Sequence, residues 1–95
     1  MMTEAKLQAE IIKWLKSKHC FVMKCPVVAG VPTGTSDIFF CYEGFYGFIE
    51  VKRSEKAKFR PLQKEFIDKM HDWSWAKSVW PDNWLEVKQE LEAML

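Results

Sequence analysis

The sequence has no long hydrophobic run, because nowhere in its 95 residues do the ~18 consecutive apolar residues of a membrane-spanning helix occur. Its three cysteines include no CxxC pair, which argues against a disulfide framework or a zinc knuckle and favours buried or unreactive thiols. The opening stretch MMTEAKLQAE is charged where a secretion signal has its apolar segment. We therefore expect a cytoplasmic protein without membrane contact. No internal repeat or low-complexity linker is present.

The composition predicts one small packed domain that spans residues 1–95. Hydrophobic residues make up 48% of the chain and include five tryptophans, which favours a packed fold over a disordered chain. A chain of this length buries only roughly 60–65% of its unfolded surface, so a dimer would add stability. The net charge of +1 says little about partners, but the distribution of the charges along the chain is informative.

Periodicity and turn residues predict an α/β fold, a mixed β-sheet flanked by helices. The expected elements are a helix over residues 3–18, strands over 21–28, 37–42 and 45–53, a helix over 61–72, a strand over 75–80 and a final helix that ends near residue 95. The inward-facing residues of the first helix are Leu7, Ile11, Trp14 and Leu15. Those of the second helix are Leu62, Phe66, Ile67 and Met70.

The second and third strands form a hairpin that carries three charged residues, Asp37, Glu50 and Lys52, within an apolar stretch. Glu50 and Lys52 are two residues apart, so they share one face of their strand. If Glu43 and Gly44 form a two-residue turn, the numbers of facing residues add to 87, and Asp37 faces Glu50. A three-residue loop would shift the pairing and break this alignment.

Two directly opposed carboxylates repel each other unless something compensates their charge. A divalent cation does so efficiently, since Mg²⁺ is typically held by one or two carboxylates together with phosphate and water oxygens. A lysine two residues further on can contact a phosphate or stabilise developing negative charge. The arrangement therefore predicts metal-assisted phosphodiester hydrolysis. The alternative is that Asp37 caps a loop, while Glu50 and Lys52 form a solvated ion pair, because E-x-K alone is a weak signal.

These residues resemble the PD-(D/E)xK nuclease superfamily, and most closely the stand-alone VRR-NUC domains of phages and bacteria. The matching pieces are Ser36-Asp37, the string FIEVKR, the helix LQKEFI and the opening TEAKLQ, which together span nearly the whole chain. One departure is Ser36, which stands where the family often has proline. The resemblance implies a restriction-endonuclease-like core, Mg²⁺ or Mn²⁺ dependence and cleavage of DNA in a bacterial or phage-infected cell. It also implies a homodimer similar to Holliday-junction resolvases.

The resemblance assigns metal binding to Asp37 and Glu50, with the Val51 backbone carbonyl as an additional ligand. It assigns the roles of catalytic lysine, helix glutamine and first-helix acid to Lys52, Gln63 and Glu4.

Helical geometry places Glu4 within the apolar stripe of its helix and Glu10 on the flank, so Glu10 is the second choice for the first-helix acid. First-turn placement of Glu4 beside the helix dipole is the alternative to a metal role. Gln63 likewise falls within the stripe of the second helix, where a buried amide needs hydrogen bonds. It would reach the acids, or it would instead bond the local backbone near Pro61.

Positive charge is concentrated beside these acids. Six basic residues lie between positions 52 and 64, opposed only by Glu55. The residues expected to contact DNA are Arg53, Lys56, Lys58, Arg60 and Lys64, with Lys24 as a weaker candidate. Such a cluster suits the phosphate backbone, although a solvated loop is the alternative. A restriction- or repair-type endonuclease that acts on duplex or flap DNA, and an inactive DNA-binding module, are the competing functions.

Overall fold

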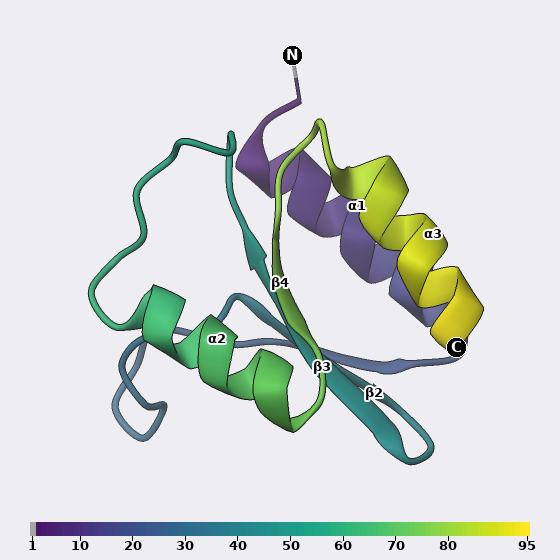
Figure 1. Ribbon diagram of the computed structural model, residues 1–95, viewed down its shortest axis with the longest axis horizontal. Coiled ribbons are helices and arrows are strands. Elements are labelled where there is room, and N and C mark those ends of the chain that lie inside the picture. The colour runs from purple at the N-terminus through teal and green to yellow at the C-terminus, as the bar shows by residue number, and fades with distance from the viewer. Residues whose placement is uncertain (1) are drawn as a thin grey trace.

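The computed structural model describes residues 2–95 and contains the seven elements in the predicted order (Figure 1). Their bounds are α1 Glu4–Ser17, β1 Phe21–Lys24, β2 Ile38–Tyr42, β3 Phe45–Val51, α2 Gln63–Trp73, β4 Ala76–Val79 and α3 Trp84–Met94. None of the helices in this described part of the chain is long and apolar enough to cross a membrane.

The four strands form one mixed sheet in the order β1-β2-β3-β4. The β1–β2 and β2–β3 pairs are antiparallel, and β4 runs parallel to β3 after the crossover through α2. Figure 1 shows α1 and α3 side by side on one face of the sheet and α2 on the other. The α/β prediction of a mixed sheet flanked by helices is therefore confirmed.

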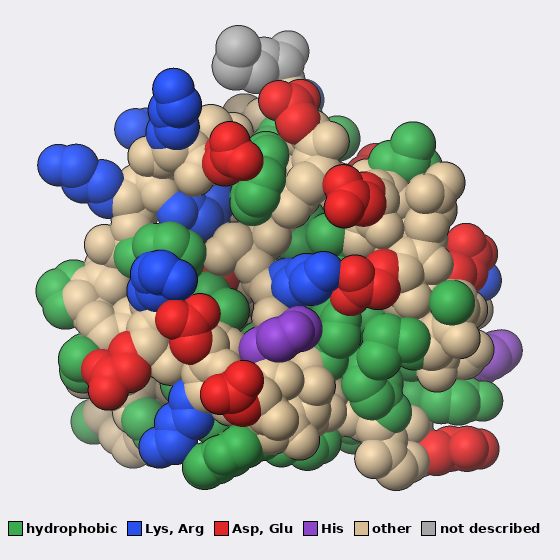
Figure 2. Space-filling model, in the orientation of Figure 1, with side chains coloured by type: hydrophobic (Ala, Val, Ile, Leu, Met, Phe, Trp, Pro, Cys, Tyr) green, Lys and Arg blue, Asp and Glu red, His purple; other side chains and the backbone are tan. Residues whose placement is uncertain are grey.

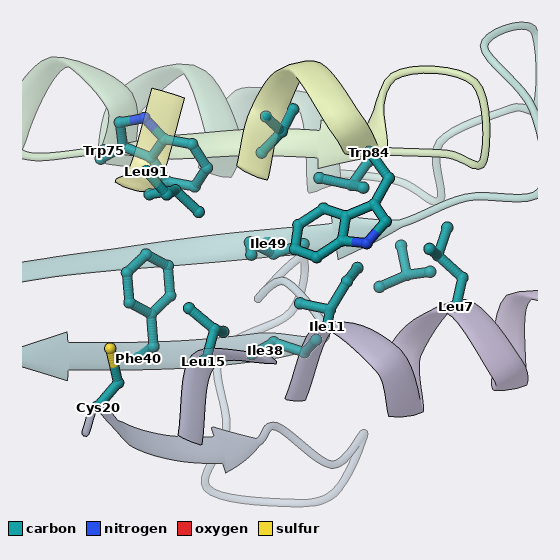
Figure 3. Close-up of a cluster of buried hydrophobic side chains, with 13 residues drawn as sticks. Leu7, Ile11, Leu15, Cys20, Ile38, Phe40, Ile49, Trp75, Trp84 and Leu91 are labelled. Carbon is teal, nitrogen blue, oxygen red and sulfur yellow. The ribbon is translucent and has the colours of Figure 1, made fainter. Parts of the chain in front are cut away.

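Most of the core lies between the sheet and the pair α1 and α3 (Figure 3). Helix α1 begins after its N-cap Thr3, whose side chain accepts a hydrogen bond from the Lys6 backbone nitrogen at 3.1 Å. Its residues Leu7, Ile11 and Leu15 are completely buried, as their helical spacing predicts. They pack with alternate strand residues and with α3, so one face of the sheet is closed to solvent.

The predicted two-residue turn is present and sets the register of the hairpin. Tyr42 pairs with Phe45 and Ile38 with Ile49, so facing residue numbers add to 87 throughout. Glu43 holds the left-handed conformation in this turn, with φ of 53°. One step beyond Ile38 and Ile49, the same register brings Asp37 opposite Glu50.

Two segments differ from the predictions. Strand β1 ends at Lys24 rather than residue 28, since Pro26 has no backbone N–H to extend the pairing. Helix α2 begins at Gln63, because Leu62 takes a left-handed conformation with φ of 69°. Leu62 was expected to face inward, and this was wrong, since its side chain is 53% exposed. The left-handed residue lies before the helix, so the helical stripe does not determine its direction.

Candidate functional site

Asp37 and Glu50 bring two carboxyl groups together at one end of the sheet. Glu50 lies in β3 and is 6% exposed, while Asp37 immediately precedes β2 and is half-buried. Asp37 Oδ2 accepts a hydrogen bond of 2.8 Å from the Val51 backbone nitrogen. Burial raises the pKa of Glu50 to about 7, and the adjacent Asp37 carboxylate contributes to the rise. Burial also raises the pKa of Asp37, so both groups resist carrying their charges at once.

The two oxygens of Glu50 have different surroundings. Glu50 Oε2 accepts a hydrogen bond of 2.8 Å from the Gln63 side-chain nitrogen. Glu50 Oε1 is buried and accepts no hydrogen bond from a donor group, and the Glu50 carboxyl lies within hydrogen-bond reach of the Asp37 carboxyl. A buried carboxylate oxygen without a partner is costly, which makes it a ready ligand for a cation.

Gln63, the first residue of α2, fixes the position of Glu50. Its side-chain oxygen accepts a hydrogen bond of 2.6 Å from the Arg60 backbone nitrogen, while its nitrogen donates to Glu50. Both roles expected for this residue therefore occur together: it bonds the backbone near Pro61 and also reaches an acid. Gln63 is 3% exposed, and the two bonds satisfy both ends of its amide.

Lys52 follows Glu50 on the same side of the strand and is 5% exposed. Its backbone nitrogen donates to the Val79 carbonyl at 2.8 Å, which continues the pairing of β3 with β4 beyond Val51. Its ammonium group lies 3.6 Å from the centre of the Phe59 ring. The negative face of the ring attracts this cation, so Phe59 fixes where the ammonium group lies.

A pocket of about 270 Å³ lies at this end of the sheet. It is lined by all five residues expected to be catalytic: Glu4, Asp37, Glu50, Lys52 and Gln63. Val51 and two residues of the basic loop, Lys58 and Arg60, complete much of its wall. The charge of Arg60 partly offsets the rise in the pKa of both carboxyl groups. We call this cavity the acidic pocket.

Glu4 reaches the acidic pocket from the first turn of α1, but it does so from the surface. Its placement on the buried face of the helix was expected and is wrong, because the side chain is exposed. The first turn extends past the packed stripe, whose first buried residue is Leu7. The carboxylate of Glu4 nevertheless contributes to the raised pKa of Asp37. Glu10 is exposed and lines neither this pocket nor the adjoining one, which leaves Glu4 as the first-helix acid at the site.

The basic residues divide into two groups. Arg53, Lys56 and Lys58 line a second cavity, of about 470 Å³, which shares Glu4 with the acidic pocket. Figure 2 shows Lys and Arg side chains gathered over the loop between β3 and α2. Lys64 instead pairs with Asp68 at 3.2 Å along α2. Lys24 lies in a separate depression beside α1. Neither Lys24 nor Lys64 lines the acidic pocket or its neighbour.

The donor set fits a hard divalent cation that keeps several non-protein ligands. Within residues 2–95, no three His, Cys, Asp or Glu side chains are grouped to hold a metal ion among themselves. Asp37, Glu50 and the neighbouring Val51 backbone supply fewer ligands than a closed metal site requires. Mg²⁺ commonly accepts such a set, since phosphate and water oxygens supply the remainder. The unpartnered Glu50 oxygen is the structural observation that supports this fit.

Two neighbours of the site were not predicted. The ring of Phe59 lies against the Lys52 ammonium group. The feature of the sequence that could have indicated this contact is an aromatic residue within an otherwise basic loop. Cys25 lies opposite Asp37, because its backbone nitrogen donates to the Asp37 carbonyl at 2.7 Å. The predicted strand over residues 21–28 contains Cys25. The long loop that follows has no turn signal that fixes the register of this strand against the next one, so the sequence does not show which residue Cys25 faces.

No protein-family model, curated protein or solved structure gives a significant match to this chain. The resemblance to VRR-NUC domains therefore stays a prediction based on the sequence motifs.

Proposed function

We propose that this protein is a Mg²⁺- or Mn²⁺-dependent endonuclease that hydrolyses phosphodiester bonds in DNA. The observation that carries the proposal is that Asp37, Glu50 and Lys52 line one pocket, with one Glu50 oxygen left without a hydrogen-bond donor. A basic loop adjoins the same pocket. The combination suits an anionic polymer whose phosphates approach a cation held by carboxylates.

Asp37, Glu50 and the Val51 carbonyl would hold the divalent ion. Such an ion polarises a phosphoryl oxygen and makes a bound water more acidic. Gln63 holds Glu50 Oε2, which keeps Oε1 directed away from that bond and available. The partial burial of the two carboxyl groups strengthens their attraction for a cation.

Lys52 is the residue suited to stabilise the negative charge that develops on the phosphate. It is nearly buried, so its charge is only weakly screened by solvent. In the hydrolysis, a water oxygen forms a new bond to phosphorus, one ester P–O bond breaks, and the leaving oxygen takes up a proton. Lys58 and Arg60 line the same pocket and would bind the flanking phosphates.

The proposed substrate is branched DNA, in particular the four-way junction, and the proposed assembly is a homodimer. Both rest on the resemblance to resolvase-like VRR-NUC domains. A symmetric pair of sites would act on two strands of a junction. Light scattering on the purified protein should give twice the chain mass. A monomer at the concentrations that support cleavage would contradict the dimer.

A cleavage assay tests the function. Four-way junction, flap and linear duplex substrates would be incubated with Mg²⁺ or Mn²⁺ and, separately, with EDTA. We expect metal-dependent cutting of the junction by the unmodified protein and by Glu43→Gln, an exposed control in the hairpin turn. We expect none by Glu50→Gln, which keeps an acceptor for Gln63 but removes the charge.

The alternative functions give different results in the same assay. Equal cutting of linear duplex would favour a restriction- or repair-type enzyme over a junction-selective one. Retained DNA binding, with no cutting of any substrate by the unmodified protein, would indicate the inactive DNA-binding module and refute the nuclease.

A further inference from the structure

A third cavity, of about 430 Å³, lies beside the acidic pocket, between residues 26–35 and the Arg60-Pro61 segment. We call it the loop pocket. In Figure 1 the loop from β1 to β2 lies beneath the N-terminal end of α2, next to the long loop that leaves β3. The volume falls in the range of roughly 300–1,000 Å³ that is usual for small-molecule sites.

The loop pocket and the acidic pocket are neighbours that share Val27 and Arg60. A ligand in the loop pocket would therefore lie next to the carboxylates. The positively charged Arg60 would stand at the boundary between the two pockets. A nucleotide has this layout, since its anionic phosphate and its base are joined by one sugar. With the phosphate at Arg60, the base has access to the loop pocket.

The wall of the loop pocket combines exposed apolar side chains with two threonines. Val27 is 80% exposed and Val28 is 57% exposed, although both lie in a loop where polar residues usually predominate. Thr33 and Thr35 line the same cavity. Apolar side chains suit the flat face of a nucleobase, and polar groups suit its edge.

The loop is held in shape by its own bonds, so the cavity exists before a ligand arrives. Thr35 donates through both its backbone nitrogen and its hydroxyl to the Pro32 carbonyl, at 3.2 and 2.7 Å. Gly34 packs so closely on Leu62 that a side-chain carbon there would lie 2.7 Å from the Leu62 backbone. The two walls are therefore in contact, and little ordering remains to be done on binding.

We propose that the loop pocket binds an unpaired nucleobase adjacent to the phosphate that is cut. This inference rests on the proposed nuclease function and identifies how its site would select branched DNA. A base within a duplex must be unstacked before it can enter such a cavity, whereas a base at a branch or flap is already free. Selectivity for branched DNA would thus come from the presence of an unpaired base and would not depend on which base it is.

The test compares two bulged duplexes that differ at one position. The first carries an unpaired 2-aminopurine nucleotide, and the second carries an abasic residue in its place. Binding is measured by anisotropy of an end label in EDTA, and the 2-aminopurine emission reports whether the base leaves solvent. The variants are Val28→Ser combined with Val31→Ser, which line the loop pocket but not the acidic pocket, and Leu85→Ser as a control that is 62% exposed on α3.

We expect the unmodified protein to bind the base-containing duplex about five- to tenfold more tightly, as burial of roughly 50 Å² of apolar surface predicts. The double variant should lose this ratio but keep its affinity for the abasic duplex, and Leu85→Ser should keep both. Equal affinities for the two duplexes would overturn the inference.

Cleavage of the same duplexes in Mg²⁺ is measured separately. Absence of cleavage would refute the nuclease proposal. The ratio of the two binding affinities would still show whether the loop pocket binds the base. A third outcome is that both duplexes are cut at equal rates in Mg²⁺ and bound with equal affinity. It would support the nuclease proposal and refute the base-binding role of the loop pocket.

Discussion

Gln63 and Glu50 join α2 to β3 through a hydrogen bond of 2.8 Å from the amide nitrogen to Oε2. The same amide accepts a hydrogen bond from the Arg60 backbone, so it also ties the end of the basic loop to the helix. One side chain therefore links a candidate metal ligand to the loop expected to contact DNA. Changes at position 63 should affect stability and activity together.

Gln63→Ala should lower the free energy of unfolding by about 1–3 kcal/mol, because it leaves the Arg60 N–H and the Glu50 carboxylate without their partner. Thermal or urea unfolding measures the loss. Gln89→Ala, an exposed change on α3, serves as the control and should change stability by less than about 0.5 kcal/mol. Equal effects of the two changes would show that the amide bonds contribute nothing at position 63.

The stability of the metal-free protein should fall as pH rises from about 4.5 to about 7. Glu50 titrates near 4.5 when unfolded and at about 7 when folded, so the folded state binds more protons within this window. The raised pKa of Asp37 acts in the same direction. A folded-state pKa that is higher by one corresponds to about 1.4 kcal/mol, so the total loss should be of the order of 3 kcal/mol. Urea unfolding in EDTA at pH 5 and pH 8 measures it.

Glu50→Gln is the matched control, because it removes the titrating group and should flatten the profile. Adding Mg²⁺ or Mn²⁺ at pH 8 should restore stability to the unmodified protein by mass action, and should do so less in the variant. A profile that rises with pH would contradict the burial of these acids.

The hairpin and its acids were accessible to sequence reasoning because a two-residue turn determines every facing pair from Tyr42 and Phe45 onward. Strand alternation then separates Glu50 from Ile49 without further information. The exposure of the Glu4 side chain could not be predicted from the sequence. A helical wheel shows on which side of the helix a residue lies, but it does not show at which residue packing against the sheet begins. Leu62 was missed because its left-handed backbone packs against Gly34, which lies 28 positions earlier in the chain and is not its neighbour in any helical or strand pattern.

Gly47→Ala should destabilise the fold by about 1–3 kcal/mol, as overpacking of a core does. A methyl group there would lie 2.7 Å from the Phe40 ring and 3.0 Å from the Trp75 ring. Phe40 is fully buried and has little room to move. Gly44→Ala is the control, because nothing lies within 4 Å of the added carbon. Denaturant unfolding of both variants should separate them, and a similar midpoint for the two would show that the core accommodates the methyl group.

Ser36→Ala should leave stability unchanged or raise it by about 1 kcal/mol. Ser36 is completely buried and its hydroxyl oxygen has no hydrogen-bond partner, so the change removes a desolvated polar group. Ser54→Ala, in the exposed part of the basic loop, is the control. Calorimetric melting measures both. A loss of more than about 1 kcal/mol at position 36 would mean that a buried water satisfies the hydroxyl.

The basic residues that line the acidic pocket should affect DNA affinity more than the one paired along α2. Lys58 and Arg60 line the acidic pocket, whereas Lys64 pairs with Asp68 on α2. Each phosphate contact that is lost should reduce the slope of log affinity against log salt by about 0.9 on duplex DNA. We therefore expect Lys58→Ala and Arg60→Ala to lower both the affinity and the slope, and Lys64→Ala to change neither appreciably. Anisotropy titrations at several salt concentrations measure this, and a larger effect at Lys64 than at Arg60 would place the DNA along α2 instead.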